Sequence, residues 1–212
     1  GEKLLEAIKE KISKGNIGGL LWSSPNNPSW SCLTESELQG IAEICDDNDI
    51  LAIEDLAYLG MDFRKDYSQP HKEPYIPTVG KFGKNWITLI SASKIFSFPG
   101  PRCGLAIISP ILNKQEFSQL EEFCGRKRFG HAFSLGGLYV TTSGTTHTAQ
   151  FALTKMLESS TNGEYNFVKV TSEYGKRAKK VCQIFLKYGF KQVYEKDMDE
   201  TVGNGFYLTM SY

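Results

Sequence analysis

Three short apolar runs, each followed by polar side chains, constrain the fold of this chain more than any other feature. The runs Gly19–Ser23, Ile50–Asp55 and Trp86–Ser91 are short and bounded by turn-forming residues, so we predict that they are buried strands. Between the first two runs, Thr34 and Glu37 form a capping-box pattern, and apolar residues follow it at helical spacing. A strand, a helix, a strand, a long connection and a strand is the order typical of an α/β sheet covered by helices.

The rest of the chain extends this pattern and then changes character. A fourth strand is predicted over 103–109, and the segment 64–85, with its prolines and glycines, is predicted to be irregular. After Pro110 helical spacing predominates, and two strands follow. The predicted helices cover 3–14, 35–45, 113–124, 146–157 and 166–188, and the late strands cover 191–195 and 205–211. We therefore predict an α/β fold with a mostly parallel sheet and flanking helices over 1–160, then a linking helix and the start of a smaller α+β domain over 161–212.

The composition excludes several classes of partner. The chain has 24 basic and 24 acidic side chains, so its net charge of zero provides no general attraction for nucleic acid or an anionic membrane. No apolar run approaches the roughly 20 residues that cross a bilayer. The five cysteines are far apart and form no CxxC pair, and the three histidines show no metal-ligand spacing. We expect buried thiols in a reducing, cytoplasmic setting, and no metal site.

Polar side chains follow each of the three predicted strands. Asn27 comes after the first strand, Asp55 and Tyr58 lie at and after the end of the second, and Lys94 follows the third. In an open α/β sheet the carboxyl ends of the strands line the ligand crevice, so we expect an amide, a carboxylate, a phenol and an amine to share one pocket. Taken singly, each has a simpler explanation: a turn-forming asparagine, a helix-capping aspartate, a core tyrosine and a surface lysine. Their common position at strand ends favours a binding site.

Three segments carry a resemblance to a known family. The stretch SPNNPSW (24–30) is similar to an Asn-Pro-Thr-Gly loop, EDLAYLGM (54–61) to an Asp-x-x-Tyr segment, and SASKIFSFPGPRCG (91–104) to a Ser-x-Ser-Lys and Pro-Gly-x-Arg-x-Gly signature. In order and local spacing the chain resembles the fold-type-I pyridoxal-phosphate enzymes, specifically the class I/II aminotransferases. It departs from their pattern where Ser29 and Trp30 replace the usual Thr-Gly and where Pro101 precedes Arg102.

The resemblance implies a site for pyridoxal 5′-phosphate (PLP) and assigns residues to it. Lys94 would form the internal aldimine with the cofactor and carry a proton between substrate and cofactor, so it is the predicted catalytic residue. Asp55 would pair with the protonated pyridine nitrogen, while Asn27 and Tyr58 would hydrogen-bond the ring oxygen. The phosphate group would be bound by Ser91, Ser93 and Arg102.

The resemblance also implies an activity and an assembly. We expect a PLP-dependent aminotransferase that moves an amino group between an amino acid and a 2-oxo acid and acts as a homodimer. Members of the family carry further segments that correspond to positions before residue 1 and after Tyr212, including a ring-stacking aromatic and a substrate-binding arginine. We therefore expect this chain to be an internal fragment, with little or no transaminase activity by itself.

Three alternatives stay open at this point. The same lysine, aspartate and arginine serve other fold-type-I PLP enzymes, such as C–S lyases and decarboxylases. A PLP-binding effector domain of a transcriptional regulator would share them too, with its DNA-binding module outside this sequence. The third alternative is an α/β scaffold whose lysine is structural and which binds no cofactor.

Overall fold

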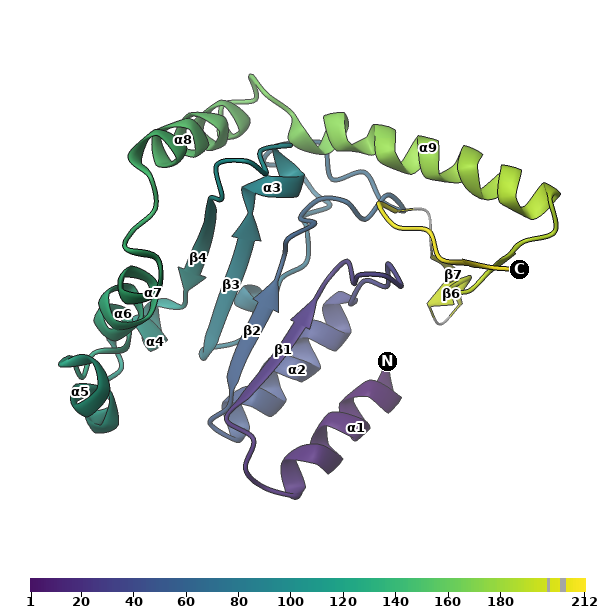
Figure 1. Ribbon diagram of the computed structural model, residues 1–212. Coiled ribbons are helices and arrows are strands. Elements are labelled where there is room, and N and C mark those ends of the chain that lie inside the picture. The colour runs from purple at the N-terminus through teal and green to yellow at the C-terminus, as the bar shows by residue number, and fades with distance from the viewer. Residues whose placement is uncertain (198, 203–204) are drawn as a thin grey trace.

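The chain is built around a four-stranded sheet that is flanked by helices (Figure 1). The computed structural model describes residues 1–197, 199–202 and 205–212. The strands lie side by side in chain order; β1 pairs with β2 and β2 with β3 in parallel, whereas β4 is antiparallel to β3. Their bounds are β1 Gly19–Ser23, β2 Leu51–Asp55, β3 Trp86–Ser91 and β4 Gly104–Ile108. The predicted α/β class with a mainly parallel sheet is confirmed.

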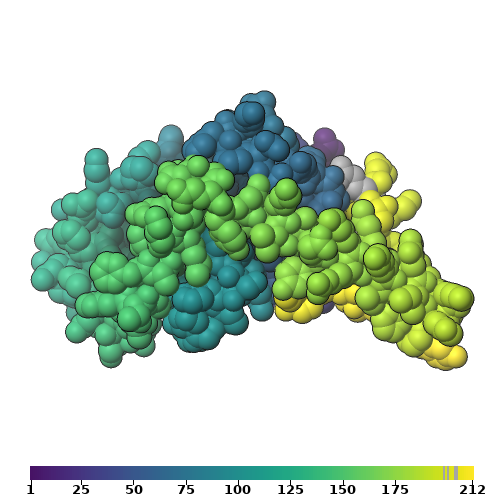
Figure 2. Space-filling model, turned by 90° about the horizontal axis from the view of Figure 1, so that it is seen from above, coloured from purple at the N-terminus to yellow at the C-terminus, as the bar shows by residue number. Residues whose placement is uncertain are grey.

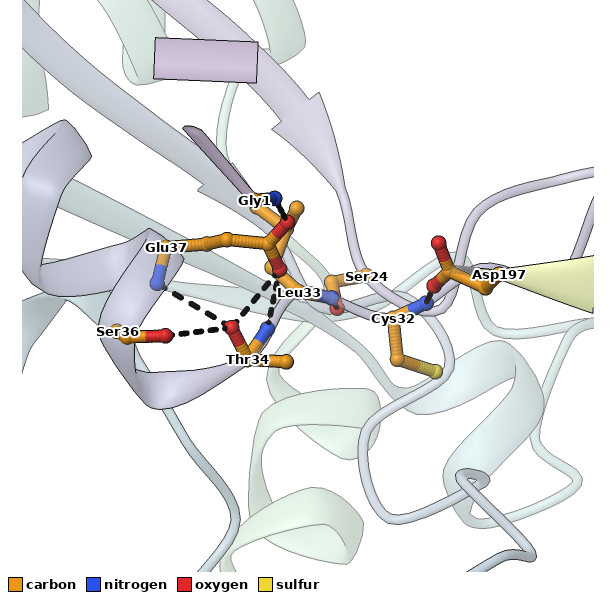
Figure 3. A network of polar contacts seen from close by, with 8 residues as sticks. All are labelled: Gly1, Ser24, Cys32, Leu33, Thr34, Ser36, Glu37 and Asp197. Atoms are coloured by element: carbon orange, nitrogen blue, oxygen red, sulfur yellow. Dashed lines mark hydrogen bonds and ion pairs between the residues drawn. The ribbon is translucent and has the colours of Figure 1, made fainter. Parts of the chain in front are cut away.

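The helix between β1 and β2 starts at the predicted capping box. The Thr34 hydroxyl accepts a hydrogen bond from the Glu37 N–H at 3.3 Å, and the Glu37 carboxylate accepts one from the Thr34 N–H at 2.8 Å (Figure 3). This helix, α2 (Glu35–Asp47), packs against α1 (Glu2–Ser13) and buries one face against the sheet. The buried residues of α2 in this core are Leu38, Ile41, Ala42 and Cys45.

The single helix predicted over 113–124 is wrong, because the chain forms two shorter helices there. These are α4 (Pro110–Lys114) and α5 (Ser118–Cys124). The residues between them pair with a later segment: the Phe117 N–H donates to the Lys127 carbonyl at 3.0 Å, and the Phe129 N–H to the Gln115 carbonyl at 2.9 Å. Further helical elements then follow in this largely helical part of the chain, although no separate helix was predicted over these residues. They are α6 (Phe129–His131), a π-helical stretch (Ala132–Tyr139) and α7 (Val140–Thr142).

Two longer helices lie on the side of the sheet where the parallel strands end. They are α8 (His147–Thr161) and α9 (Phe167–Lys187), close to their predicted positions (Figure 1). Figure 2 views them from above, beside the segment around residues 60–75. α9 contacts the short helix α3 (Ala92–Ile95), which directly follows β3. The segment 64–85 is irregular as predicted, apart from one 3₁₀ turn at Val79–Lys81.

After α9 the chain forms two short antiparallel strand pairs. β5 (Lys191–Gln192) pairs with β8 (Met210–Ser211), and β6 (Lys196–Asp197) pairs with β7 (Glu200–Thr201). The strands predicted over 191–195 and 205–211 are therefore shorter than expected. The Cys32 N–H donates to the Asp197 carboxylate at 3.3 Å, which ties this C-terminal unit to the loop after β1 (Figure 3). The division into domains 1–160 and 161–212 stays a prediction.

The cysteines are unpaired, as expected. All five are free thiols, and four of them are buried, with Cys124 half-buried. Within the described residues, no helix combines the length and the apolar character needed to cross a membrane. The same residues contain no group of three or more His, Cys, Asp or Glu side chains placed to hold a metal ion.

A carboxyl group is fully buried in β2, one residue before the end of the strand. Glu54 in β2 is 0% exposed, and its Oε2 accepts hydrogen bonds from the Thr78 hydroxyl at 2.5 Å and the Val79 N–H at 3.2 Å. Its Oε1 has no partner among the described residues, and neither has the Nε1 of Trp22, the residue opposite Glu54 on β1. Burial raises the pKa of the Glu54 carboxyl, more than these hydrogen bonds lower it.

We predict that Glu54→Gln makes the free energy of unfolding less dependent on pH, because the variant has no buried carboxyl group to ionise. The folded protein holds the Glu54 proton more tightly than the unfolded chain does, so wild type loses stability relative to the neutral variant as pH rises from about 4.5 through the raised pKa. Urea unfolding of both proteins between pH 4 and 7 measures this difference, with the exposed Glu6→Gln as control. A difference that stays constant with pH contradicts the prediction.

Candidate functional site

A tight turn at the end of β2 places two of the predicted site residues. Asp55 is the last residue of β2, and its Oδ1 accepts a hydrogen bond from the Ala57 N–H at 2.9 Å. The Leu56 N–H donates to the Leu89 carbonyl of β3 at 2.8 Å, which continues the strand pairing beyond Asp55. Tyr58 follows in the same turn and is 7% exposed. The carboxylate and the phenol are therefore held at one corner of the sheet by backbone geometry.

The Tyr58 hydroxyl lies in a small hydrogen-bonded group. It bonds to the Tyr207 hydroxyl at 3.1 Å and to the Asn27 side chain, which comes from the loop after β1. Burial, followed by the hydrogen bond with Tyr207, raises the pKa of Tyr58 to about 12, although the Asn27 bond acts in the opposite direction. Tyr58 is thus protonated at neutral pH and can donate a hydrogen bond.

Lys94 lies at the same edge of the sheet, shortly after the end of β3. It lies in the last turn of α3 and is half-buried. Its Nζ is 5.4 Å from the centroid of the Phe206 ring, a distance typical of a cation–π contact. The Phe206 ring is in turn 6.0 Å from the Tyr58 ring, centroid to centroid. Phe206 therefore lies between the amine and the phenol.

The remaining predicted residues gather around α3. The Ser91 hydroxyl caps this helix by accepting a hydrogen bond from the Ser93 N–H at 3.3 Å. The Arg102 guanidinium donates from Nη1 to the Ser93 hydroxyl at 3.4 Å and to the Pro99 carbonyl at 2.9 Å. Arg102 is exposed and has a φ of 55°, which turns the chain back toward Ser93 after the proline–glycine turn. A guanidinium in contact with a hydroxyl group is suited to an anion such as a phosphate group.

The structure brings the predicted residues to one edge of the sheet, where they form two groups. In the first group the Asn27 side chain contacts Tyr58, and Asp55 lies in the same turn as Tyr58. The second group consists of Ser91, Ser93 and Arg102, and Lys94 lies beside Phe206. Among the described residues, no hydrogen bond joins the Lys94 amine to the other six. Together they offer an amine, a carboxylate, neutral hydrogen-bond donors and a guanidinium. This set of groups fits a ligand with an aldehyde for the amine, a ring nitrogen for the carboxylate, a ring hydroxyl for the neutral donors and a phosphate for the guanidinium.

Comparison with known proteins identifies the family of this chain. Residues 2–191 match the family described as aminotransferase class I and II. This chain belongs to that family. Class I and II aminotransferases depend on PLP, so PLP is the cofactor that membership of this family implies for the chain.

Individual relatives are similar over parts of their length. A histidinol-phosphate aminotransferase of Macrococcus caseolyticus is 32% identical over 106 residues, which cover 50% of this chain and 28% of that protein. The aspartate aminotransferase from Thermus thermophilus with maleate superposes with a TM-score of 0.62 at 19% identity, covering 90% of this chain and 43% of that one. A PLP-bound protein from Clostridium difficile 630 gives a TM-score of 0.57 at 18% identity, covering 89% and 43%. This chain therefore spans less than half the length of these relatives.

Trp30 is a member of the site region that the sequence analysis noted only as a departure. It stands where the family usually has glycine, and its φ of 62° is in the left-handed region that favours glycine. The ring is 4% exposed, its Nε1–H donates to the Met61 carbonyl at 3.1 Å, and its centroid is 5.1 Å from that of Tyr58. Trp30 therefore keeps a left-handed backbone that suits glycine, while its ring packs edge-on against the ring of Tyr58.

Phe206 and Tyr207 were missed altogether. Both belong to the segment 205–211 that was predicted as a strand, and no local pattern indicates that they approach Tyr58. The only signal in the sequence is that two aromatic residues directly follow Gly205.

We predict that Trp30→Gly destabilises the protein even though it restores the residue usual in the family. Loss of a buried aromatic ring costs about 3–5 kcal/mol, and relief of the left-handed backbone returns about 1–2 kcal/mol. The free energy of unfolding should fall by the difference, about 1–4 kcal/mol. Urea unfolding measures it, with Trp30→Phe as a control that keeps a ring and should lose less. Equal or greater stability of the glycine variant contradicts this account.

Proposed function

We propose that the full protein containing this chain transfers an amino group between an amino acid and a 2-oxo acid. The observation that carries the proposal is the family match over residues 2–191, which includes the seven predicted site residues. The position of Lys94 after β3, at the edge where β2 also ends, supports it. The identities of the relatives as aminotransferases support the same reaction type.

The lysine and the aspartate would act on the reacting part of the cofactor. PLP supplies an aldehyde that joins to amines and a protonated ring that accepts the electrons of a bond broken at the substrate α-carbon. Lys94 would hold the aldehyde carbon and, once released by the substrate, move a proton from the α-carbon. Asp55 has one oxygen engaged by the Ala57 N–H, and its negative charge would keep a ring nitrogen protonated.

The other five residues would bind and orient the cofactor. Tyr58 stays protonated, so it and the Asn27 amide can donate hydrogen bonds to an anionic ring oxygen. Ser91 and Ser93 would offer hydroxyls to the phosphate, and Arg102 a guanidinium. The Ser93–Arg102 contact supports a shared role for these two residues.

The setting of the protein is also proposed here. A homodimer in the cytoplasm is the arrangement that we expect, in line with the free, mostly buried thiols and with the family to which the chain belongs. The residues 1–160 would form part of the cofactor-binding large domain, and 161–212 the linking helix and the start of the small domain.

We predict that Lys94 is required for PLP to remain bound with its visible absorption. The full protein is incubated with PLP, freed of unbound cofactor by gel filtration, and its spectrum is recorded beside that of Lys94→Ala. Wild type should show a visible band that shifts when amino acids are added, and the variant should lack it because no amine replaces Lys94.

The matched control is Lys155→Ala, which removes an exposed lysine of α8 and should leave the band unchanged. A wild-type protein that shows no band contradicts the proposed function and favours a scaffold. A Lys94→Ala protein that keeps the band assigns the attachment to another lysine.

A further inference from the structure

The segment Gly205–Tyr207 lies against the site edge of the sheet. Gly205 is buried, and its Cα is so close to the Trp30 ring that a Cβ has no space there. The Phe206 ring packs against Tyr174 of α9, with 4.8 Å between centroids, as well as against Tyr58. Contacts from the sheet edge, the loop after β1 and α9 therefore fix this segment from three sides.

Tyr207 reaches the site through its hydroxyl group. The 3.1 Å contact with the Tyr58 hydroxyl joins residues that are 149 positions apart in the chain. The two rings meet edge-on, with 5.9 Å between centroids and an interplanar angle of 85°, and Tyr207 also lies 6.1 Å from the Trp30 ring. Both phenols are thereby held with their hydroxyl groups in contact.

A pair of phenols can change the direction of its hydrogen bond at little cost. Each hydroxyl has one proton to donate and two lone pairs to accept with. In the structure Tyr58 donates to Tyr207. When an anionic acceptor faces Tyr58, rotation of the two O–H groups lets Tyr207 donate to Tyr58 and Tyr58 donate to the anion. Hydrogen bonds in such a chain strengthen one another, so Tyr58 becomes the better donor.

We propose that Tyr207 is a positioning residue of the cofactor site, which orients the Tyr58 hydroxyl and strengthens the hydrogen bond that it donates to the ring oxygen of the cofactor. This inference rests on the proposed function, because it takes the cofactor to be the acceptor. A stronger bond to the ring oxygen stabilises negative charge there, and so favours the deprotonated form of the bound cofactor. Tyr207 therefore lowers the pH at which the visible band titrates.

The test is a pH titration of the visible band in the full protein loaded with PLP. Tyr207→Phe removes one hydroxyl and keeps the ring, and the titration midpoint should rise by about 0.3–1 pH unit, the effect of one weakened hydrogen bond. In a Tyr58→Phe background the same change should add no further shift, because the residue through which Tyr207 acts is gone. The control is Tyr188→Phe, an exposed tyrosine at 69% whose loss should not move the midpoint.

A second replacement should shift the titration midpoint in the opposite direction while it preserves the shape of the site. Replacing Tyr207 by 3-fluorotyrosine keeps the hydroxyl but makes it a stronger donor, so the midpoint should fall below that of wild type. Thermal unfolding of each variant establishes that the fold is retained.

The outcomes separate this inference from the proposed function. A wild-type protein without a visible band overturns both. A wild-type band that is lost in Lys94→Ala, with an unchanged midpoint in Tyr207→Phe and in the 3-fluorotyrosine protein, overturns the role of Tyr207 and leaves the proposed function standing. Equal shifts of Tyr207→Phe with and without the Tyr58 hydroxyl also overturn it, because Tyr207 would then act by another route.

Discussion

Parallel pairing of β2 with both of its neighbours is the constraint on which the site depends. Because β1, β2 and β3 run in one direction and in aligned register, the residues that follow them meet at a single edge. Hydrogen bonds continue this pairing past the strand ends, from the Ser24 N–H to the Asp55 carbonyl and from the Leu56 N–H to the Leu89 carbonyl. The carboxylate of Asp55 and the amine of Lys94 reach the same edge for this reason, although 38 other residues separate them in the sequence.

The aromatic residues at this edge connect packing with chemistry. The rings of Trp30, Phe206 and Tyr207 pack around Tyr58, which is buried. The burial that stabilises this cluster also raises the pKa of Tyr58 and keeps it a hydrogen-bond donor. One set of contacts thus serves both the stability of the fold and the protonation state of Tyr58, a residue proposed to bind the cofactor.

Features encoded locally were predictable from the sequence, whereas features created by distant contacts were not. The strand Trp86–Ser91 and the capping box at Thr34 each depend on neighbouring residues, and both were found where expected. The break in the helix over 113–124 arises from pairing with residues 127–129, so spacing within the helix gave no sign of it. The same distinction applies to the site. The order of the motifs located Lys94 and the other predicted residues at strand ends. Tyr207, in contrast, reaches Tyr58 only because the chain turns back after α9, and no local pattern encodes that contact.

Covalent trapping of the cofactor tests the central claim most directly. The full protein is loaded with PLP, reduced with borohydride, digested, and the pyridoxyl-bearing peptide is identified by mass spectrometry. Reduction fixes the cofactor to whichever amine holds it. We predict that the modification is found on Lys94, within the peptide that ends the β3 segment. Modification of another lysine, with Lys94 unmodified, would contradict the account.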